Sequence, residues 1–247
     1  MKKLVAYITA GFPSKSFSVD LALSLKEAGV DSLELGIPFS DPVADGPIIE
    51  QANLKALQNG FKIEDLFDIS KQIGKEIDTL WMGYFNPFYH KGMDFFADRA
   101  KEYGVSGFII PDLPHEEAKV YTNMMKERDI SLISFVAPTD SSDRINQVVK
   151  TSSKFIYLVA YAGITGSGTS EDLSETIVSI RKSTDTPVYV GFGVDEKTAK
   201  DKVKGVDGVI VGSAFVKILL NDTLNNSQKI EKISSLAKII KETINEV

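Results

Sequence analysis

The sequence predicts a (β/α)8 barrel, an α/β fold in which eight parallel strands alternate with outer helices, as a single domain over residues 1–247. Eight short apolar runs alternate with amphipathic segments, and 247 residues is a typical length for one such barrel. The runs are almost continuously apolar, as expected of parallel strands buried on both faces. A helix-to-strand joint, in which a glycine ends the helical pattern, also recurs: AGVDSLELGIP at 28–38, YGVSGFIIPD at 103–112 and KGVDGVIVGS at 204–213.

The apolar runs define the expected strands in chain order. They span residues 3–9, 31–36, 78–84, 106–111, 131–136, 155–160, 187–191 and 207–211. The segments between them have helical periodicity: Phe17, Leu21 and Leu25 share one face after the first strand, and apolar residues at 230–244 recur at a 3-4-3-4 spacing. An open doubly wound sheet fits the same alternation and remains an alternative from the pattern alone.

Composition narrows the classes of partner. Lys plus Arg total 28 against 34 Asp plus Glu, and the resulting net charge of −6 disfavours binding to a nucleic-acid backbone. The chain has no cysteine, which excludes disulfides, thiolate nucleophiles and sulfur-ligated metals and suits a reducing compartment. No apolar run approaches the roughly 20 residues of a membrane span. We therefore expect a cytoplasmic protein without nucleic-acid or membrane partners.

The second expected strand carries an acidic residue between apolar ones. In Ser32-Leu33-Glu34-Leu35-Gly36, Leu33 and Leu35 share one face, and Glu34 shares the other with Gly36. If the leucines contact the helices, Glu34 points into the barrel, where loss of hydration raises the pKa of a carboxyl group and suits it to general acid/base catalysis. A structural carboxylate, held by a lysine or by backbone donors, is the alternative.

The connection after this strand, residues 37–47, is unusually long and contains Asp41 and Asp45. Its three prolines restrict the backbone, so that both carboxylates can be held with little loss of entropy. Loops at the carboxyl ends of barrel strands carry the catalytic residues of this fold. The alternative is an ordinary turn or helix-cap aspartate, above all for Asp45, two residues before Pro47 at an expected helix start.

Glycines gather after the last three expected strands. Glycine turns let backbone amides approach a phosphate closely, and the N-termini of helices favour anions. Phosphate sites after strands seven and eight are common in such barrels, although glycine also serves in turns and caps. We therefore expect a phosphorylated substrate near residues 163–168, 191–193 and 212–213.

The remaining candidates are weaker. The two histidines lack metal-ligand spacing, so we assign no role to His90 or His115. Several aromatic residues stand where an apolar pocket would lie, although core packing is the commoner use of such residues; they are Tyr7, Trp81, Phe85 and Tyr157.

Residues 33–47, LELGIPFSDPVADGP, closely resemble the signature of the tryptophan synthase alpha family. The resemblance covers nearly the whole chain, because further segments agree in order and spacing: GYFNPFY at 83–89, PDLPHEEA at 111–118, FVAPTDSSDRI at 135–145, YAGITG at 161–166, GFGV at 191–194 and VGSAFVK at 211–217.

This resemblance implies the retro-aldol cleavage of indole-3-glycerol phosphate to indole and glyceraldehyde 3-phosphate, with no metal or organic cofactor on this chain. It makes Glu34 the general acid/base that acts on indole C3 and on the glyceryl hydroxyl, and Asp45 the acceptor of the indole N–H. It also implies two sets of binding residues: Tyr7, Met82, Tyr157, Thr165 and Phe192 for the substrate, and Gly166, Gly193, Gly212 and Ser213 for its phosphate.

The resemblance further implies a beta subunit, which carries pyridoxal phosphate, as partner in an α2β2 heterotetramer that makes L-tryptophan. Asp41 and Pro42 match a loop that signals between the subunits, and residues 163–168 match a lid over the substrate. Three alternatives stay open: a free-standing lyase that releases indole, a chain that chiefly activates the beta subunit, and another phosphate-binding barrel such as a sugar-phosphate isomerase.

Overall fold

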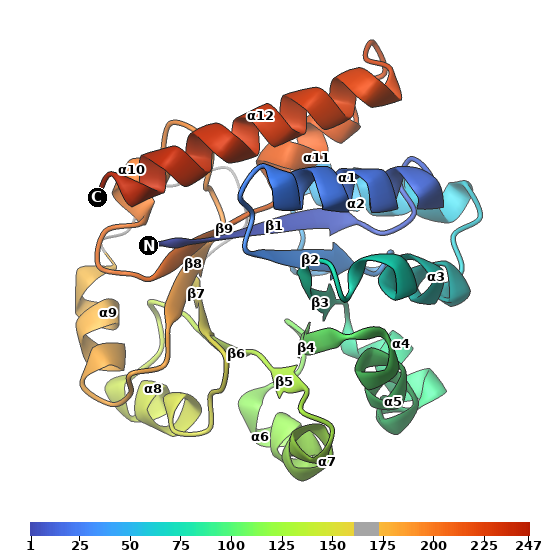
Figure 1. Cartoon of the computed structure of the whole chain (residues 1–247). Coiled ribbons are helices and arrows are strands. Elements are labelled where there is room, and N and C mark those ends of the chain that lie inside the picture. The colour runs from blue at the N-terminus through green and yellow to red at the C-terminus, as the bar shows by residue number, and fades with distance from the viewer. Residues whose placement is uncertain (161–172) are drawn as a thin grey trace.

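The computed structural model describes residues 1–160 and 173–247. All its strands run parallel in one sheet of order β5-β4-β3-β2-β1-β9-β8-β7-β6. The two ends of this order, β5 and β6, are consecutive in the chain, so the sheet curves round into a barrel surrounded by helices (Figure 1). The predicted barrel is confirmed, and the open doubly wound sheet is wrong.

The strands match the expected runs with one difference. They are β1 (Lys3–Thr9), β2 (Ser32–Gly36), β3 (Asp78–Met82), β4 (Val105–Ile109), β5 (Ser131–Leu132), β6 (Ser134–Val136), β7 (Ile156–Val159), β8 (Val188–Gly191) and β9 (Gly208–Val211). The fifth expected strand, 131–136, is divided at Ile133 because, within the described ranges, β5 pairs with β4 alone and β6 pairs with β7 alone. This division opens the barrel wall at one point.

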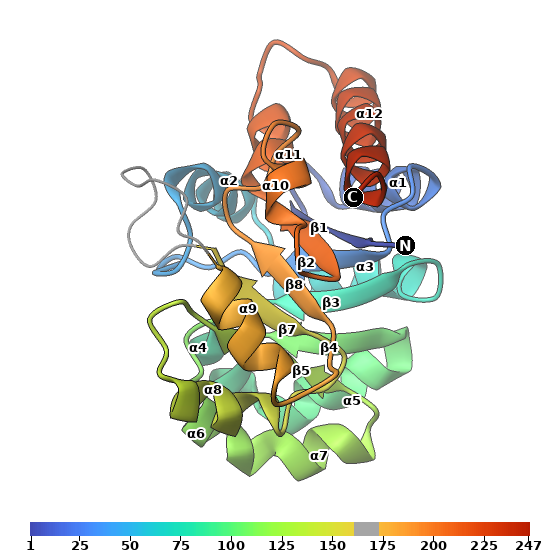
Figure 2. The ribbon, with the colours of Figure 1, turned by 90° about the vertical axis from the view of Figure 1, so that its left-hand side faces the viewer.

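The helices of the described residues form the outer layer (Figures 1 and 2). They are α1 (Lys15–Glu27), α2 (Pro47–Gln58), α3 (Ile63–Ile73), α4 (Phe85–Lys91), α5 (Met93–Tyr103), α6 (His115–Ala118), the 3-10 helix η1 (Lys119–Tyr121), α7 (Thr122–Glu127), α8 (Ser142–Val149), α9 (Ser174–Arg181), α10 (Ala199–Lys202), α11 (Ser213–Leu219) and α12 (Asn226–Asn245). Side chains cap several N-termini; Ser14, for example, accepts the Phe17 N–H at 3.2 Å. None of these helices has the length and apolar character needed to cross a membrane.

Two apolar layers follow from the alternation of side chains along the strands. The outer layer lies between strands and helices and includes Leu33, Leu35 and Trp81, whose indole N–H donates to Ser70 Oγ of α3 at 2.8 Å. Trp81 therefore serves the core, not a pocket. The inner cluster fills the barrel and consists of Val5, Leu80, Ile109, Ile133, Phe155, Tyr157 and Ile210.

Candidate functional site

Glu34 lies inside the barrel, as its alternation with Leu33 and Leu35 predicts. It pairs in register with Tyr7 of β1 and Leu80 of β3, and only 2% of its surface is exposed. Its Oε1 has no hydrogen-bond partner in the described part of the chain. Burial, reinforced by the negative charge of Asp45, raises the pKa of Glu34 to about 8. Such a carboxyl group can exchange protons near neutral pH.

Two glycines make room for aromatic rings beside this carboxyl group. A Cβ added at Gly36 would lie 2.3 Å from the Tyr7 hydroxyl, and one added at Gly191 would lie 2.4 Å from the hydroxyl of Tyr157. Both tyrosines are buried, and burial raises the pKa of each well above its usual value. Both hydroxyls therefore stay protonated next to Glu34. Gly191, which the sequence grouped with phosphate-binding glycines, is needed for the ring of Tyr157.

Asp45 does not cap a helix, because the N-cap of α2 is Gly46. Its Oδ2 accepts a hydrogen bond from Asn53 Nδ2 of α2 at 3.1 Å, and the Tyr84 hydroxyl also bonds its carboxylate. Burial raises the pKa of Asp45 to about 7, while these two bonds oppose the rise. Sequence reasoning missed Asn53 and Tyr84, because nothing in their local pattern distinguishes them from core residues.

Aromatic side chains line the interior near Glu34. The rings of Phe135 and Tyr157 are stacked with centroids 4.9 Å apart, and Phe192 meets Tyr157 edge-on at 6.0 Å. Phe192 has a φ of 72°, a strained conformation for a residue with a side chain. Met82 packs against the inner cluster as well. The structure thus brings together the aromatic residues expected for a ring, and it adds Phe135, which pairs in register with Tyr157 of β7.

The glycines proposed for phosphate lie at the same ends of the strands. Gly193 follows Phe192 with a φ of 68° and has open space around it. Gly212 precedes α11, and a Cβ there would be 3.5 Å from the Cβ of Tyr7, so this turn borders the ring beside Glu34. Ser213 is the first residue of α11 and is exposed. Thr165, Gly166 and the expected lid at 163–168 lie outside the described residues.

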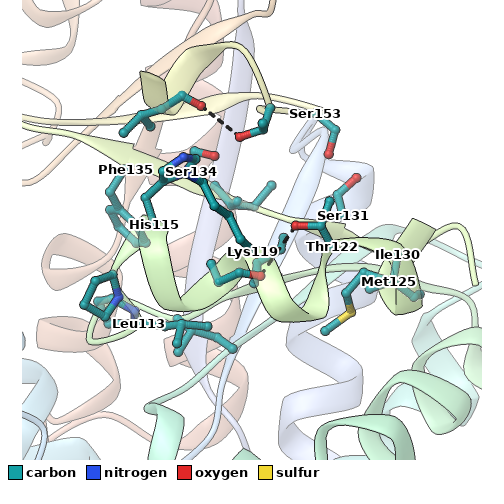
Figure 3. Close-up of a pocket in the computed structure, with 18 of the residues that line it drawn as sticks. Leu113, His115, Lys119, Thr122, Met125, Ile130, Ser131, Ser134, Phe135 and Ser153 are labelled. Atoms are coloured by element: carbon teal, nitrogen blue, oxygen red, sulfur yellow. Dashed lines mark hydrogen bonds between the residues drawn. The ribbon is translucent and has the colours of Figure 1, made fainter. Parts of the chain in front are cut away.

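A separate cavity of about 720 Å³ lies over the division between β5 and β6 (Figure 3). Its walls come from α6, η1 and α7 on one side and α8 on the other, with Ser134 at the strand. Phe135 borders both this cavity and the interior of the barrel. His115 also lines it; its buried Nε2 has no hydrogen-bond partner among the described residues, and burial lowers its pKa. No motif in the sequence indicates this cavity.

The surface around Asp41 and Pro42 is exposed and partly apolar. Ser40 donates a hydrogen bond to the Asp41 carboxylate at 2.5 Å. The next side chain, Val43, is 81% exposed, and Tyr89 of α4 is 69% exposed. Since both follow the carboxyl ends of neighbouring strands, they lie on the same end of the barrel as the site.

The fold is a parallel barrel, and two carboxyl groups of raised pKa lie among aromatic rings at the carboxyl ends of its strands. This fold and site define an enzyme of the acid/base class that acts on a substrate with an apolar ring. In the described ranges, no group of three or more His, Asp or Glu residues is arranged to hold a metal ion.

Comparison with known proteins gives the family. The family model for the tryptophan synthase alpha chain matches residues 1–245. The chain is 58% identical to the alpha chain of Wolinella succinogenes over 246 residues, which cover 99% of this chain and 96% of that one. It resembles a structure of tryptophan synthase from M. tuberculosis with a TM-score of 0.87 and 30% identity, covering 98% of this chain and 93% of the other. It also resembles a chain from the Pyrococcus furiosus α2β2 complex, with a TM-score of 0.84, 32% identity, and coverage of 98% and 100%.

The chain belongs to the tryptophan synthase alpha chain family. The expected resemblance is therefore confirmed over almost the full length, and so is the carbon–carbon lyase class of enzyme that it implied. The reading as an unrelated sugar-phosphate isomerase is wrong.

Proposed function

We propose that this chain cleaves indole-3-glycerol phosphate to indole and glyceraldehyde 3-phosphate, with Glu34 and Asp45 as the catalytic residues. The observation that carries this proposal is the state of Glu34, a buried carboxyl group with a free Oε1 and a pKa raised to about 8. The family membership supports the same reaction.

The two carboxyl groups divide the proton transfers between them. Protonated Glu34 donates its proton to indole C3, and the positive charge that develops on the ring is stabilised by ionised Asp45 through the indole N–H. The Glu34 carboxylate then takes the proton of the glyceryl hydroxyl. As that hydroxyl becomes the aldehyde carbonyl, the C–C bond breaks, and its electron pair returns to the ring to give neutral indole. Glu34 is protonated again at the end of the cycle.

We assign the indole ring and the phosphate of the substrate to binding residues by the position of those residues in the barrel. Tyr7, Met82, Tyr157 and Phe192 form the apolar surroundings of the indole ring, a role supported by their packing against the inner cluster. Backbone amides at Gly193, Gly212 and Ser213 hold the phosphate, as supported by the open turn at Gly193 and by the first amides of α11, which have no partner within the helix. From the sequence alone, we add Thr165 to the substrate-binding residues and Gly166 to the phosphate-binding residues.

The proposed partner is a beta subunit, which carries pyridoxal phosphate and joins this chain in an α2β2 complex. The structure of the Pyrococcus furiosus relative, which is named as an α2β2 complex, supports this assembly. We assign the contact on this chain to Asp41, Pro42 and the exposed Val43 and Tyr89, because large exposed apolar side chains grouped near a site mark interaction surfaces.

We assign no cofactor to this chain. One domain over residues 1–247 and a cytoplasmic location are likewise proposals.

Indole release from indole-3-glycerol phosphate tests the function. The purified chain is assayed alone and with a tryptophan synthase beta subunit, as wild type and as Glu34→Gln. Slow turnover that accelerates with the beta subunit and falls by about two to four orders of magnitude in the variant is expected. Fast turnover indifferent to the beta subunit would identify a free-standing lyase instead. If the Glu34→Gln variant kept full activity, the proposed catalytic role would be wrong, and activation of the beta subunit would be the remaining function of this chain.

A further inference from the structure

Two buried side chains, Tyr84 and Asn53, contact the carboxylate of Asp45, and the mechanism above uses neither. Asn53 donates from Nδ2 to Asp45 Oδ2 at 3.1 Å, and the Tyr84 hydroxyl bonds the same carboxylate. Each side chain is 1% exposed. Asn53 belongs to α2, whereas Tyr84 follows β3 and is the N-cap residue of α4, so two separate elements hold one carboxylate.

The bonding of Tyr84 fixes the direction of its hydroxyl proton. The Ala44 N–H donates to the phenol oxygen at 3.0 Å, and a backbone N–H can only donate. The phenol proton is therefore available to Asp45. Burial and the nearby charge of Asp45 raise the pKa of Tyr84, so the proton stays in place. The ring also stacks on Phe39, with centroids 5.6 Å apart, and thus fastens the loop near both of its ends.

Asn53 occupies a position that suits an apolar residue better. It is buried on α2, and its Oδ1 has no hydrogen-bond partner in the described ranges. A buried polar atom without a partner lowers stability. Among the described residues, the one side-chain hydrogen bond of Asn53 goes to Asp45. Since the carboxylate accepts only, it also determines which end of the amide faces it.

We propose that Tyr84 and Asn53 are positioning residues that hold Asp45 in its charged form, aimed at the ring N–H of the substrate. This inference rests on the role proposed for Asp45. It extends the site to residues that do not touch the reacting atoms and act only through another side chain.

The charges around Asp45 explain why two hydrogen bonds are needed. In the part of the chain that the structure describes, the titratable groups that interact with it are Glu34 of β2, Tyr7 of β1, Tyr157 of β7, Glu50 of α2 and Tyr84. None of these carries a positive charge. Burial and Glu50 raise the pKa of Asp45, and the bonds from Tyr84 and Asn53 lower it. Loss of either bond should therefore move the pKa upward and leave less Asp45 ionised at neutral pH.

The test is the pH profile of kcat/KM for indole release by Tyr84→Phe and Asn53→Ala. Tyr84→Phe keeps the ring on Phe39 and removes only the hydroxyl. We expect the acid limb to move up by about one pH unit in each variant, so that kcat/KM on this limb falls to about a tenth of the wild-type value. At higher pH, where Asp45 is ionised in all the proteins, each variant should approach the wild-type value, and all should share the alkaline limb of Glu34. The matched control is Tyr121→Phe, which removes a phenol hydroxyl from a half-buried residue of η1 in the outer layer and should leave the limb in place.

Asp45→Asn separates this inference from the proposed function. If Asp45→Asn keeps full activity, the role of Asp45 itself is wrong. If Asp45→Asn is impaired while Tyr84→Phe and Asn53→Ala keep the wild-type acid limb, the positioning role is overturned and the catalytic role stands. Thermal melts of each variant monitor folding. A purely structural contribution would lower activity evenly across pH, and that result also contradicts the inference.

Discussion

The ring of Tyr7 occupies the space above Gly36, so that a Cβ added at residue 36 would lie 2.3 Å from the Tyr7 hydroxyl. These residues belong to adjacent strands, β1 and β2, and Gly36 lies two residues after Glu34 on the same face. The glycine is therefore required for the position of a ring beside the catalytic carboxyl group. Gly191 of β8 has the same relationship to Tyr157 of the adjacent strand β7.

Gly36→Ala should displace the Tyr7 ring and lower both stability and turnover. Forcing a methyl group into a packed interior costs about 1–3 kcal/mol of unfolding free energy, which urea titration measures. Gly212→Ala is the control for stability, because the nearest described atoms to its Cβ, in Ile49 and Tyr7, would lie at 3.5 Å, an ordinary contact. Equal stability of the two variants would contradict the packing argument.

The pH profile of kcat/KM should be bell-shaped, with its maximum between the two pKa values. Asp45, with a pKa of about 7, must be ionised, and Glu34, with a pKa of about 8, must be protonated. Activity therefore falls below the first value and above the second. Because the charge of Asp45 contributes to the raised pKa of Glu34, the residual activity of Asp45→Asn should have its alkaline limb at lower pH. An unmoved limb would show that the two groups are not coupled.

Glu34→Gln should stabilise the fold at alkaline pH while it removes activity. The folded-state pKa of Glu34 is raised from 4.5 to about 8, so the unfolded chain loses this proton first. Folding stability from this group is complete below pH 4.5 and is lost as pH rises through about 8. The variant should gain a few kcal/mol over wild type at pH 8.5 and much less at pH 5. Chemical denaturation at both pH values measures the difference, which a pH-independent gap would contradict.

Tyr89→Asp should weaken binding of the beta subunit without changing basal indole release by the isolated chain. Its side chain is 69% exposed on α4, and placing a charge in an apolar contact costs on the order of tenfold in affinity. Ile239→Asp is the matched control, since that residue is 49% exposed on α12. Titration calorimetry gives both dissociation constants. If Ile239→Asp weakens binding as much as Tyr89→Asp, the contact lies elsewhere.

The order of the barrel could be predicted because parallel strands buried on both faces are marked by apolar runs. The division of the fifth strand at Ile133 could not, since residues 131–136 form one continuous run and only the pairing of β5 with β4 and of β6 with β7 divides it. The cavity beside Ser134 lies over that division, and the stacking of Phe135 on Tyr157 goes with the pairing of β6 and β7. Both depend on neighbours that are distant in the sequence.

The sequence by itself determined the strand order and the inward direction of Glu34, because alternation along a strand is a local property with a period of two residues. Only the tertiary structure decided what surrounds the two carboxyl groups. Asp45 lies in an irregular loop, where no period assigns it a direction, and its partners Asn53 and Tyr84 reach it from different elements. The raised pKa values of Glu34 and Asp45 arise from burial, which exists only once the strands and loops have packed together.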